Sequence, residues 1–131
     1  MPIRVVNTRN VAATAFPPGI RVSGDMGLLF LSGITARPLD LEPGAAFQFP
    51  DDIDVQTRMM LENVQGVLEQ AGATWRDVIK ITRFYTESGG GDVVREFLQG
   101  WNPCTTTLGV TRLPLPGAKI MYDVIAAVPE A

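Results

Sequence analysis

Apolar and polar residues follow two different periods along this chain, and the longer period predicts helices. From Asp54 to about Ala71, apolar residues return every three or four positions, as at Leu61, Val64 and Leu68. Gly72 is suited to the residue just after such a helix. A second helix is predicted from Asp92, which can cap its start, to about Trp101.

The remaining apolar runs predict strands. They are short, rich in branched and aromatic residues, and bounded by glycine and proline. Thr74–Asp77 has capping-box form and predicts one short turn. Strands are expected at Ile3–Val6, around Arg21, and at Leu28–Gly33, Val78–Thr86, Thr105–Val110 and Lys119–Val128. No repeat or linker divides residues 1–131, so we predict a single α+β domain, a six-stranded mixed sheet with two helices on one face.

Two helices leave the other face of such a sheet uncovered. That face would carry residues such as Ile79, Ile81 and Tyr85, or the residues that alternate with them. They are too apolar to be left in water. The pattern therefore predicts self-association through sheet surfaces.

Composition excludes several classes of function. The net charge is −3 and no stretch concentrates lysine and arginine, so no nucleic-acid partner is expected. No apolar run approaches the ~20 residues of a membrane span, so no membrane partner is expected either. The absence of histidine removes Ser-His and Cys-His pairs and most zinc sites, and no metal or cofactor is expected. One cysteine and no export segment indicate a cytoplasmic protein.

Three residues are candidates for chemistry, each with a plainer alternative. Cys104 is the one soft nucleophile, but strand alternation places it opposite the face that Thr105 and Thr107 share. Asp123 lies in an apolar strand, where it is either an interface acid bonded to arginine or backbone N–H groups, or a functional acid. Ser32 either faces a cleft or only caps the end of its strand.

Three segments resemble the Rid family, the YjgF-type reactive-intermediate deaminases. They are "LLFLSG", "QTRMMLENVQGVLEQAGATWRDVIKITRFYT" and "TTTLGVTRLP…GAKIMYDVIAAV", and the resemblance covers about Pro18 to Val128. It implies a chorismate-mutase-like α+β fold. It also implies a homotrimer whose sheets face inward, with three clefts between neighbouring subunits.

The same resemblance implies where a site would lie, and most positions depart from the family pattern. Deaminating members hydrolyse enamines and imines, using an arginine for the substrate carboxylate, a glutamate beside a water, a tyrosine and an asparagine. At the corresponding positions this chain has Thr105, Met121, Gly19 and, on the second helix, Arg95, while Thr107 replaces a frequent cysteine and Ser32-Gly33 is retained.

These departures change the expected ligand and keep two classes of function open. Threonine cannot replace the charge of a guanidinium, so the pocket suits a neutral or partly apolar small molecule, unless Arg21 or Arg95 restores an anion contact. We expect a diverged Rid-type enzyme that hydrolyses, hydrates or tautomerises a small reactive intermediate, with Asp123 as general acid and base. A narrower version gives Cys104 covalent chemistry. The alternative is a non-catalytic homotrimer that binds a ligand or a protein. Ribonuclease activity is disfavoured by the acidic composition and the lack of histidine.

Overall fold

In the part of the chain that the structure describes, six strands and two α-helices follow one another in the predicted order β-β-β-α-β-α-β-β. The structure is a computed structural model that describes residues 2–8 and 16–129. The elements are β1 (Ile3–Val6), β2 (Gly19–Val22), β3 (Met26–Phe30), α1 (Ile53–Gln70), the short 3₁₀ turn η1 (Trp75–Asp77), β4 (Val78–Tyr85), α2 (Gly91–Leu98), β5 (Cys104–Gly109) and β6 (Ile120–Pro129). The α+β fold is therefore confirmed. No helix in the described part of the chain is long and apolar enough to cross a membrane.

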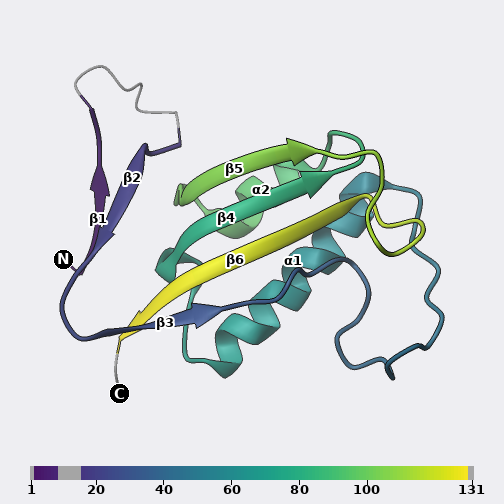
Figure 1. Ribbon diagram of the computed structural model, residues 1–131, viewed down its shortest axis with the longest axis horizontal. Helices are drawn as coiled ribbons and strands as arrows, with labels where there is room; N and C mark the ends of the chain where they lie inside the picture. Colours follow the sequence, from purple (N-terminus) through teal and green to yellow (C-terminus); the bar gives the residue numbers. More distant parts are fainter. Residues whose placement is uncertain (1, 9–15, 130–131) are drawn as a thin grey trace.

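The six strands form two sheets, where the sequence predicted one. The main sheet has the order β3-β6-β4-β5 and is mixed, because β4 and β5 are parallel while the other pairs are antiparallel. β1 and β2 pair only with each other, as an antiparallel ribbon beside the main sheet (Figure 1). Both strands of the ribbon are four residues long, and little of their sequence distinguishes this pairing from addition to a sheet edge.

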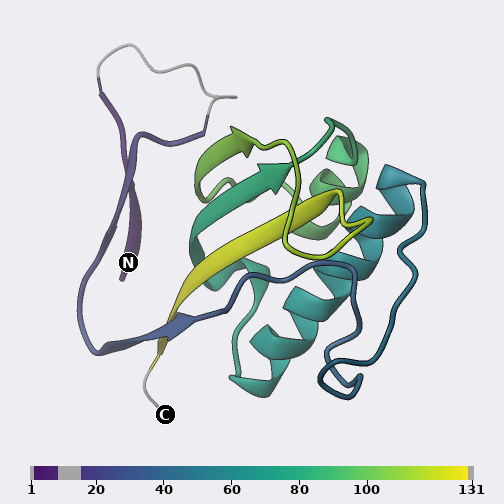
Figure 2. The ribbon, with the colours of Figure 1, turned by 45° about the vertical axis from the view of Figure 1, so that its right-hand side comes forward.

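Both helices cover the same face of the main sheet, as two views show (Figures 1 and 2). On β6, alternate residues from Ile120 to Ala126 are fully buried against them. α1 adds Met60, Leu61, Val64 and Leu68 to the same core, at the spacing that predicted the helix. We call this side of the sheet the helix-covered face.

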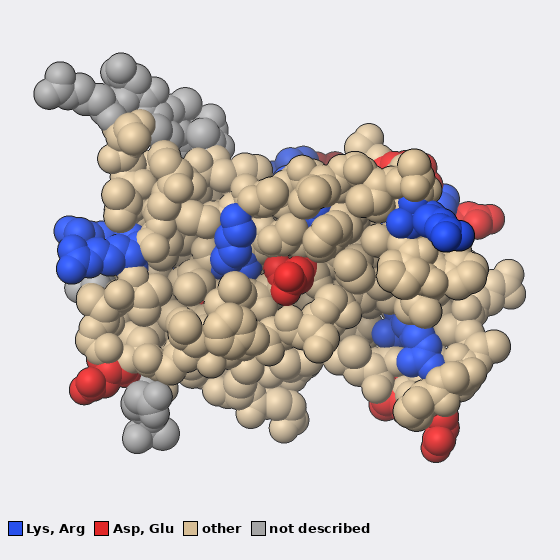
Figure 3. Space-filling model, in the orientation of Figure 1, with Lys and Arg blue, Asp and Glu red and all other residues tan. Residues whose placement is uncertain are grey.

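The opposite side, which we call the open face, carries the alternating residues. Ile81 lies in the core, so its neighbours Lys80 and Thr82 point to the open face. Leu28 and Phe30 of β3 are 57% and 67% exposed there, because Leu29 between them packs on the core. In Figure 3 this face is largely uncharged, and only a few charged groups interrupt it.

The two helix starts depend on specific local contacts. The Asp52 side chain caps α1 by accepting hydrogen bonds from the N–H groups of Asp54 (2.8 Å) and Val55 (3.3 Å). The predicted capping role of Asp92 is wrong: Gly90 occupies that position with a positive φ of 78°. A Cβ at Gly90 would lie 2.2 Å from the Thr57 Oγ1, so close helix packing requires glycine there.

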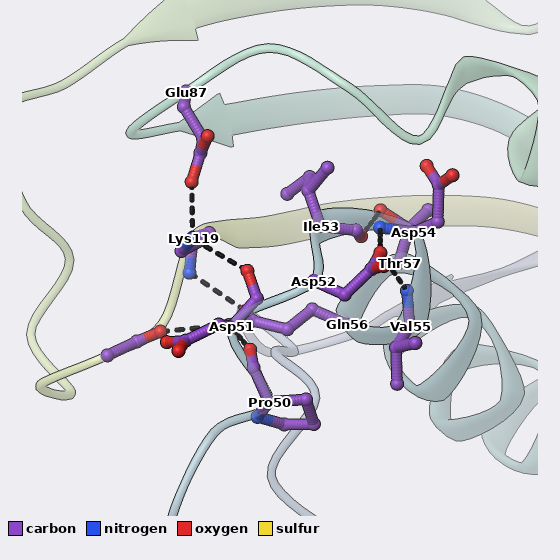
Figure 4. A network of polar contacts seen from close by, with 11 residues as sticks. Pro50, Asp51, Asp52, Ile53, Asp54, Val55, Gln56, Thr57, Glu87 and Lys119 are labelled. Atoms are coloured by element: carbon purple, nitrogen blue, oxygen red, sulfur yellow. Dashed lines mark hydrogen bonds and ion pairs between the residues drawn. The ribbon is translucent and has the colours of Figure 1, made fainter.

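A buried glutamine fixes α1 against the turn that precedes β6 (Figure 4). Gln56 is fully buried and its Nε2 donates to the carbonyl oxygens of Pro50 (2.6 Å) and Gly117 (2.9 Å). Its Oε1 accepts a hydrogen bond from the Lys119 N–H (2.9 Å). The Lys119 ammonium in turn pairs with Glu87, just after β4, at 2.6 Å. This network holds the ends of β4 and β6 together.

Candidate functional site

Arg83 lies in the middle of the main sheet, on the helix-covered face that it shares with Ile81 and Tyr85. In register it is opposite Tyr122 of β6 on one side and Thr107 of β5 on the other. Its Nε donates to the Thr107 Oγ1 at 3.0 Å. Among the described residues Arg83 makes no ion pair.

A small pocket lies between Arg83 and α2. Its volume is about 230 Å³, below the roughly 300–1,000 Å³ typical of pockets for drug-sized ligands. Its apolar wall consists of Phe16, Ile81, Val94 and Leu98. Its polar lining consists of Arg83, Arg95, Asn102, Thr105 and Tyr122. We call it the Arg83 pocket.

Aromatic rings flank the guanidinium that lines this pocket. The Arg83 Cζ lies 5.2 Å from the centroid of the Phe16 ring and 5.8 Å from that of Tyr85. Such contacts favour the cation. They leave the N–H donors, which lie in the plane of the guanidinium group, available for other partners. A second hollow of about 480 Å³ adjoins the first, and Arg83 and Gly91, the first residue of α2, line both.

Tyr122 presents a hydroxyl without a partner to the same pocket. The residue is fully buried, and no hydrogen-bond partner for its hydroxyl is found in the described part of the chain. Burial raises the pKa of this hydroxyl far above its ordinary value; Tyr85 adds to the rise and Arg83 opposes it. The phenol is therefore neutral and able to donate a hydrogen bond.

Three residues proposed from the sequence lie at or beside the Arg83 pocket. Thr105 lines it, and its hydroxyl donates to the Pro103 carbonyl (2.9 Å). Thr107 lines the adjoining hollow and accepts from Arg83. Arg95 also lines the pocket, but it is exposed and forms an ion pair with Asp92 on the same helix.

A second group of proposed residues lies on the open face. Asp123 is exposed and pairs in register with Thr82 of β4. Met121, two residues earlier, is half-buried and meets Gly33, where a Cβ would lie 2.9 Å from the Met121 Sδ. Ser32 is exposed beside them. Within one subunit, therefore, Asp123 and Thr105 are separated by the sheet.

The other proposed residues line neither hollow. Gly19 and Arg21 belong to the β1–β2 ribbon, opposite Val6 and Arg4. The Cys104 thiol is half-buried and lies 3.6 Å from the Pro17 carbonyl oxygen, to which it donates. No cluster of three or more acidic, cysteine or histidine residues in the described ranges is arranged to hold a metal ion.

Sequence reasoning missed three polar residues of this pocket, Arg83, Asn102 and Tyr122. The signal was present, since alternation in "VIKITRFYT" places Arg83 on the same face as the core residue Ile81. A charged side chain on the helix-covered face of a central strand indicates a partner or a function, because burying an unpaired charge is unfavourable. The cross-strand register that joins it to Tyr122 was not visible in the sequence.

Comparison with known proteins identifies the family. The fold, two helices on one face of a mixed sheet, first defines the chain as an α+β protein. A family model described as "Endoribonuclease L-PSP" matches residues 8–128, so the chain belongs to this family, the YjgF/Rid family. The sequence resemblance is thereby confirmed.

Particular relatives support the same assignment. The chain is 32% identical over 81 residues to "RutC family protein PYRAB12510" of Pyrococcus abyssi, covering 59% of this chain and 62% of that protein. It is 29% identical to "Reactive Intermediate Deaminase A, chloroplastic" of Arabidopsis thaliana, covering 93% of this chain and 64% of that protein. The chain thus spans less than two thirds of the length of both relatives.

A solved structure shows the same fold. The Rid-family protein YyfB of Yersinia pestis, described as being of unknown function, superposes with a TM-score of 0.78 over 98% of this chain and 100% of that one, at 24% identity. At this identity the match concerns the fold alone.

Proposed function

We propose that this protein is an enzyme that acts on a small reactive imine or enamine by hydrolysis, hydration or tautomerisation. The observation that carries the proposal is the Arg83 pocket, which is small, has an apolar wall and contains convergent donors. Membership of the YjgF/Rid family supports it, as does the name of one relative, a reactive intermediate deaminase. A cytoplasmic location stays a prediction.

The site is proposed to lie in a cleft between subunits of a homotrimer. Thr105 and Thr107 lie on one face of the main sheet, and Asp123 and Met121 lie on the other, so the two pairs can meet only across a subunit boundary. The open face carries exposed Leu28, Phe30 and Leu108, which a second copy of the chain would cover. One subunit would then supply Asp123, Ser32 and Gly33, and its neighbour the Arg83 pocket.

In this arrangement Asp123 acts as general acid and base. For hydrolysis, its carboxylate takes a proton from water as the oxygen bonds to the carbon of the C=N group. That proton goes to nitrogen and gives a carbinolamine. Asp123 then takes the proton of the new hydroxyl group and passes it to nitrogen as the C–N bond breaks, so that a carbonyl product and ammonia leave. A carboxylate enclosed in an apolar cleft between subunits is suited to this exchange.

A hydrolysis assay tests the proposal. Imines are generated from a panel of amino acids by an amino-acid oxidase, and ammonia release is followed with and without this protein. We expect acceleration over the spontaneous rate, and a loss of at least about a hundredfold in Asp123→Asn. Asp25→Asn, at an exposed turn, is the matched control.

Two outcomes contradict the assignment. An unchanged rate in Asp123→Asn would remove the role given to that residue. If no imine in the panel were accelerated while a small molecule still bound, the chain would be a non-catalytic binding trimer. The narrower hypothesis, covalent catalysis by Cys104, predicts rapid alkylation of this thiol by iodoacetamide near neutral pH. Slow alkylation would contradict it.

A further inference from the structure

The strongest unexplained feature of the Arg83 pocket is that its donors exceed its acceptors. A guanidinium has five N–H donors, and Arg83 uses its Nε on Thr107, with no carboxylate among the described residues paired to the remaining nitrogens. The buried Tyr122 hydroxyl is a further donor without a partner in the same part of the chain. A buried donor without an acceptor is unfavourable, so this pocket is suited to a ligand that supplies acceptors.

We propose that Arg83 and Tyr122 form a carboxylate-binding subsite, so that the substrate is a small carboxylic acid. This inference rests on the proposed function and names the substrate class of the same site. A carboxylate offers two coplanar acceptor oxygens, which match the two Nη groups of a guanidinium. One of these oxygens can also accept from the tyrosine hydroxyl.

The subsite lies beside Thr105, the position at which the sequence resemblance implies an arginine in deaminating relatives. Ile81 pairs in register with Thr105, and Arg83 with Thr107, so positions 83 and 105 lie diagonally on the same face of neighbouring strands. Both line the Arg83 pocket. Neighbouring strands are about 4.8 Å apart, which is within the reach of an arginine side chain. Arg83 therefore brings a guanidinium into this pocket from β4, the strand next to that of Thr105.

The other cations near the site are less suited to this role. Arg95 is already paired with Asp92 and is exposed to solvent, where a single ion contact adds little. Arg21 lies on the β1–β2 ribbon and does not line the pocket. Lys80 is on the open face and donates to Thr106 at 2.8 Å. Arg83 alone among these four combines a pocket position with an unpaired charge.

The size and wall of the pocket narrow the class of acid. A volume of about 230 Å³ excludes ligands of drug size. Phe16, Ile81, Val94 and Leu98 form the wall around the donors, so the part of the acid beyond its carboxylate is apolar. A short aliphatic or single-ring acid satisfies both conditions.

Binding of matched acid and amide probes tests the subsite. Propanoate and benzoate are titrated into the purified protein by calorimetry, with propanamide and benzamide as neutral counterparts of the same shape. We expect at least one acid to bind at least tenfold more tightly than its amide. Arg83→Gln should remove that difference, whereas Lys80→Gln, a cation on the open face, should preserve it.

A second variant keeps the test independent of folding damage. Arg83→Gln/Thr105→Arg returns a guanidinium to the pocket from β5, and we expect it to recover at least part of the preference for the acid. Each variant is checked by its Tm. Equal binding of acid and amide by the parent protein, no binding of either acid, or an unchanged preference in folded Arg83→Gln would each overturn the subsite.

The binding test and the hydrolysis assay test different claims, so one can fail while the other succeeds. Turnover of neutral imines that is unaffected by Arg83→Gln, together with no acid preference, would overturn the carboxylate subsite and leave the proposed function standing. Acid-selective binding without turnover of any imine would overturn the proposed function and leave the carboxylate subsite standing.

Discussion

Arg83 and Tyr122 are directly opposite each other on β4 and β6, and together they bring a charge and an unpartnered hydroxyl to one small pocket. Neither group is needed for packing, since an aliphatic residue and a phenylalanine would fill the same positions. Their pairing is the clearest indication that this face of the sheet is shaped for a ligand.

Tyr122→Phe should separate ligand binding from stability. It removes a buried hydroxyl that has no partner among the described residues and keeps the ring, so the free energy of unfolding should stay unchanged or rise by about 1 kcal/mol. Affinity for a small carboxylate should fall several-fold, because one donor is lost. Urea denaturation and calorimetric titration measure the two effects. A clearly destabilised variant would mean that the hydroxyl has a structural partner.

Tyr122 should also set part of the alkaline limit of stability. Its pKa is raised in the folded state, so the stability it contributes is complete below the ordinary tyrosine pKa of about 10 and is lost as the pH rises above that value. One such group can lower the free energy of unfolding by up to about 1.4 kcal/mol per pH unit. We expect a shallower loss between pH 10 and 11.5 in Tyr122→Phe. An identical pH profile in parent and variant would contradict the buried, neutral phenol.

Gln56→Leu should be strongly destabilising. The substitution removes three hydrogen bonds and leaves the Pro50 and Gly117 carbonyls and the Lys119 N–H without their partner. Since the site is fully buried, we expect a loss of about 3 kcal/mol or more in the free energy of unfolding. Gln70→Leu, at the exposed end of α1, should change it by less than about 0.5 kcal/mol. Similar losses in both variants would show that the network contributes little.

Much of the fold was accessible from periodicity, and the parts that were not depend on tertiary contacts. The three- to four-residue spacing of Leu61, Val64 and Leu68 predicted α1 to within a residue at its start and end. Predicting Asp92 as the cap of α2 and Trp101 as its end placed the cap two residues late and the end three residues late. Gly90 is needed there only because Thr57 of the other helix lies against it.

The candidate site was less accessible for a related reason. Alternation correctly predicted that Thr105 and Thr107 share a face, and that Asp123 lies with Met121. It did not show that the sheet separates these two pairs, nor that Arg83 lies next to Thr107. Those relations depend on which strands are neighbours and in what register, and one sequence contains no direct record of either.

Phe30→Asp should weaken self-association. Phe30 is 67% exposed on the open face, and a charge there would be desolvated when a second copy of the chain covers it. We expect a shift from trimer toward monomer in sedimentation velocity at micromolar concentration. Leu39→Asp is the matched control, because Leu39 is 55% exposed in the segment between β3 and α1. A monomeric parent protein, or a trimer that resists Phe30→Asp, would exclude this face as the interface.

Subunits with different defects should restore each other's activity. If Asp123 and Arg83 meet only across a subunit boundary, then Asp123→Asn and Arg83→Gln damage opposite halves of the same site. In a randomly mixed cyclic trimer, about a quarter of the sites combine an intact half from each variant. Purification through two affinity tags removes the trimers of a single variant, and each remaining trimer has one intact site in three. About a third of the parent activity is therefore expected, while each variant alone is nearly inactive. Arg83→Gln mixed with Tyr122→Phe should not exceed the average of the two variants measured alone, because both changes fall on the same half. Restored activity in that control, or none in the first mixture, would mean that the site does not combine Asp123 and Arg83 from neighbouring subunits.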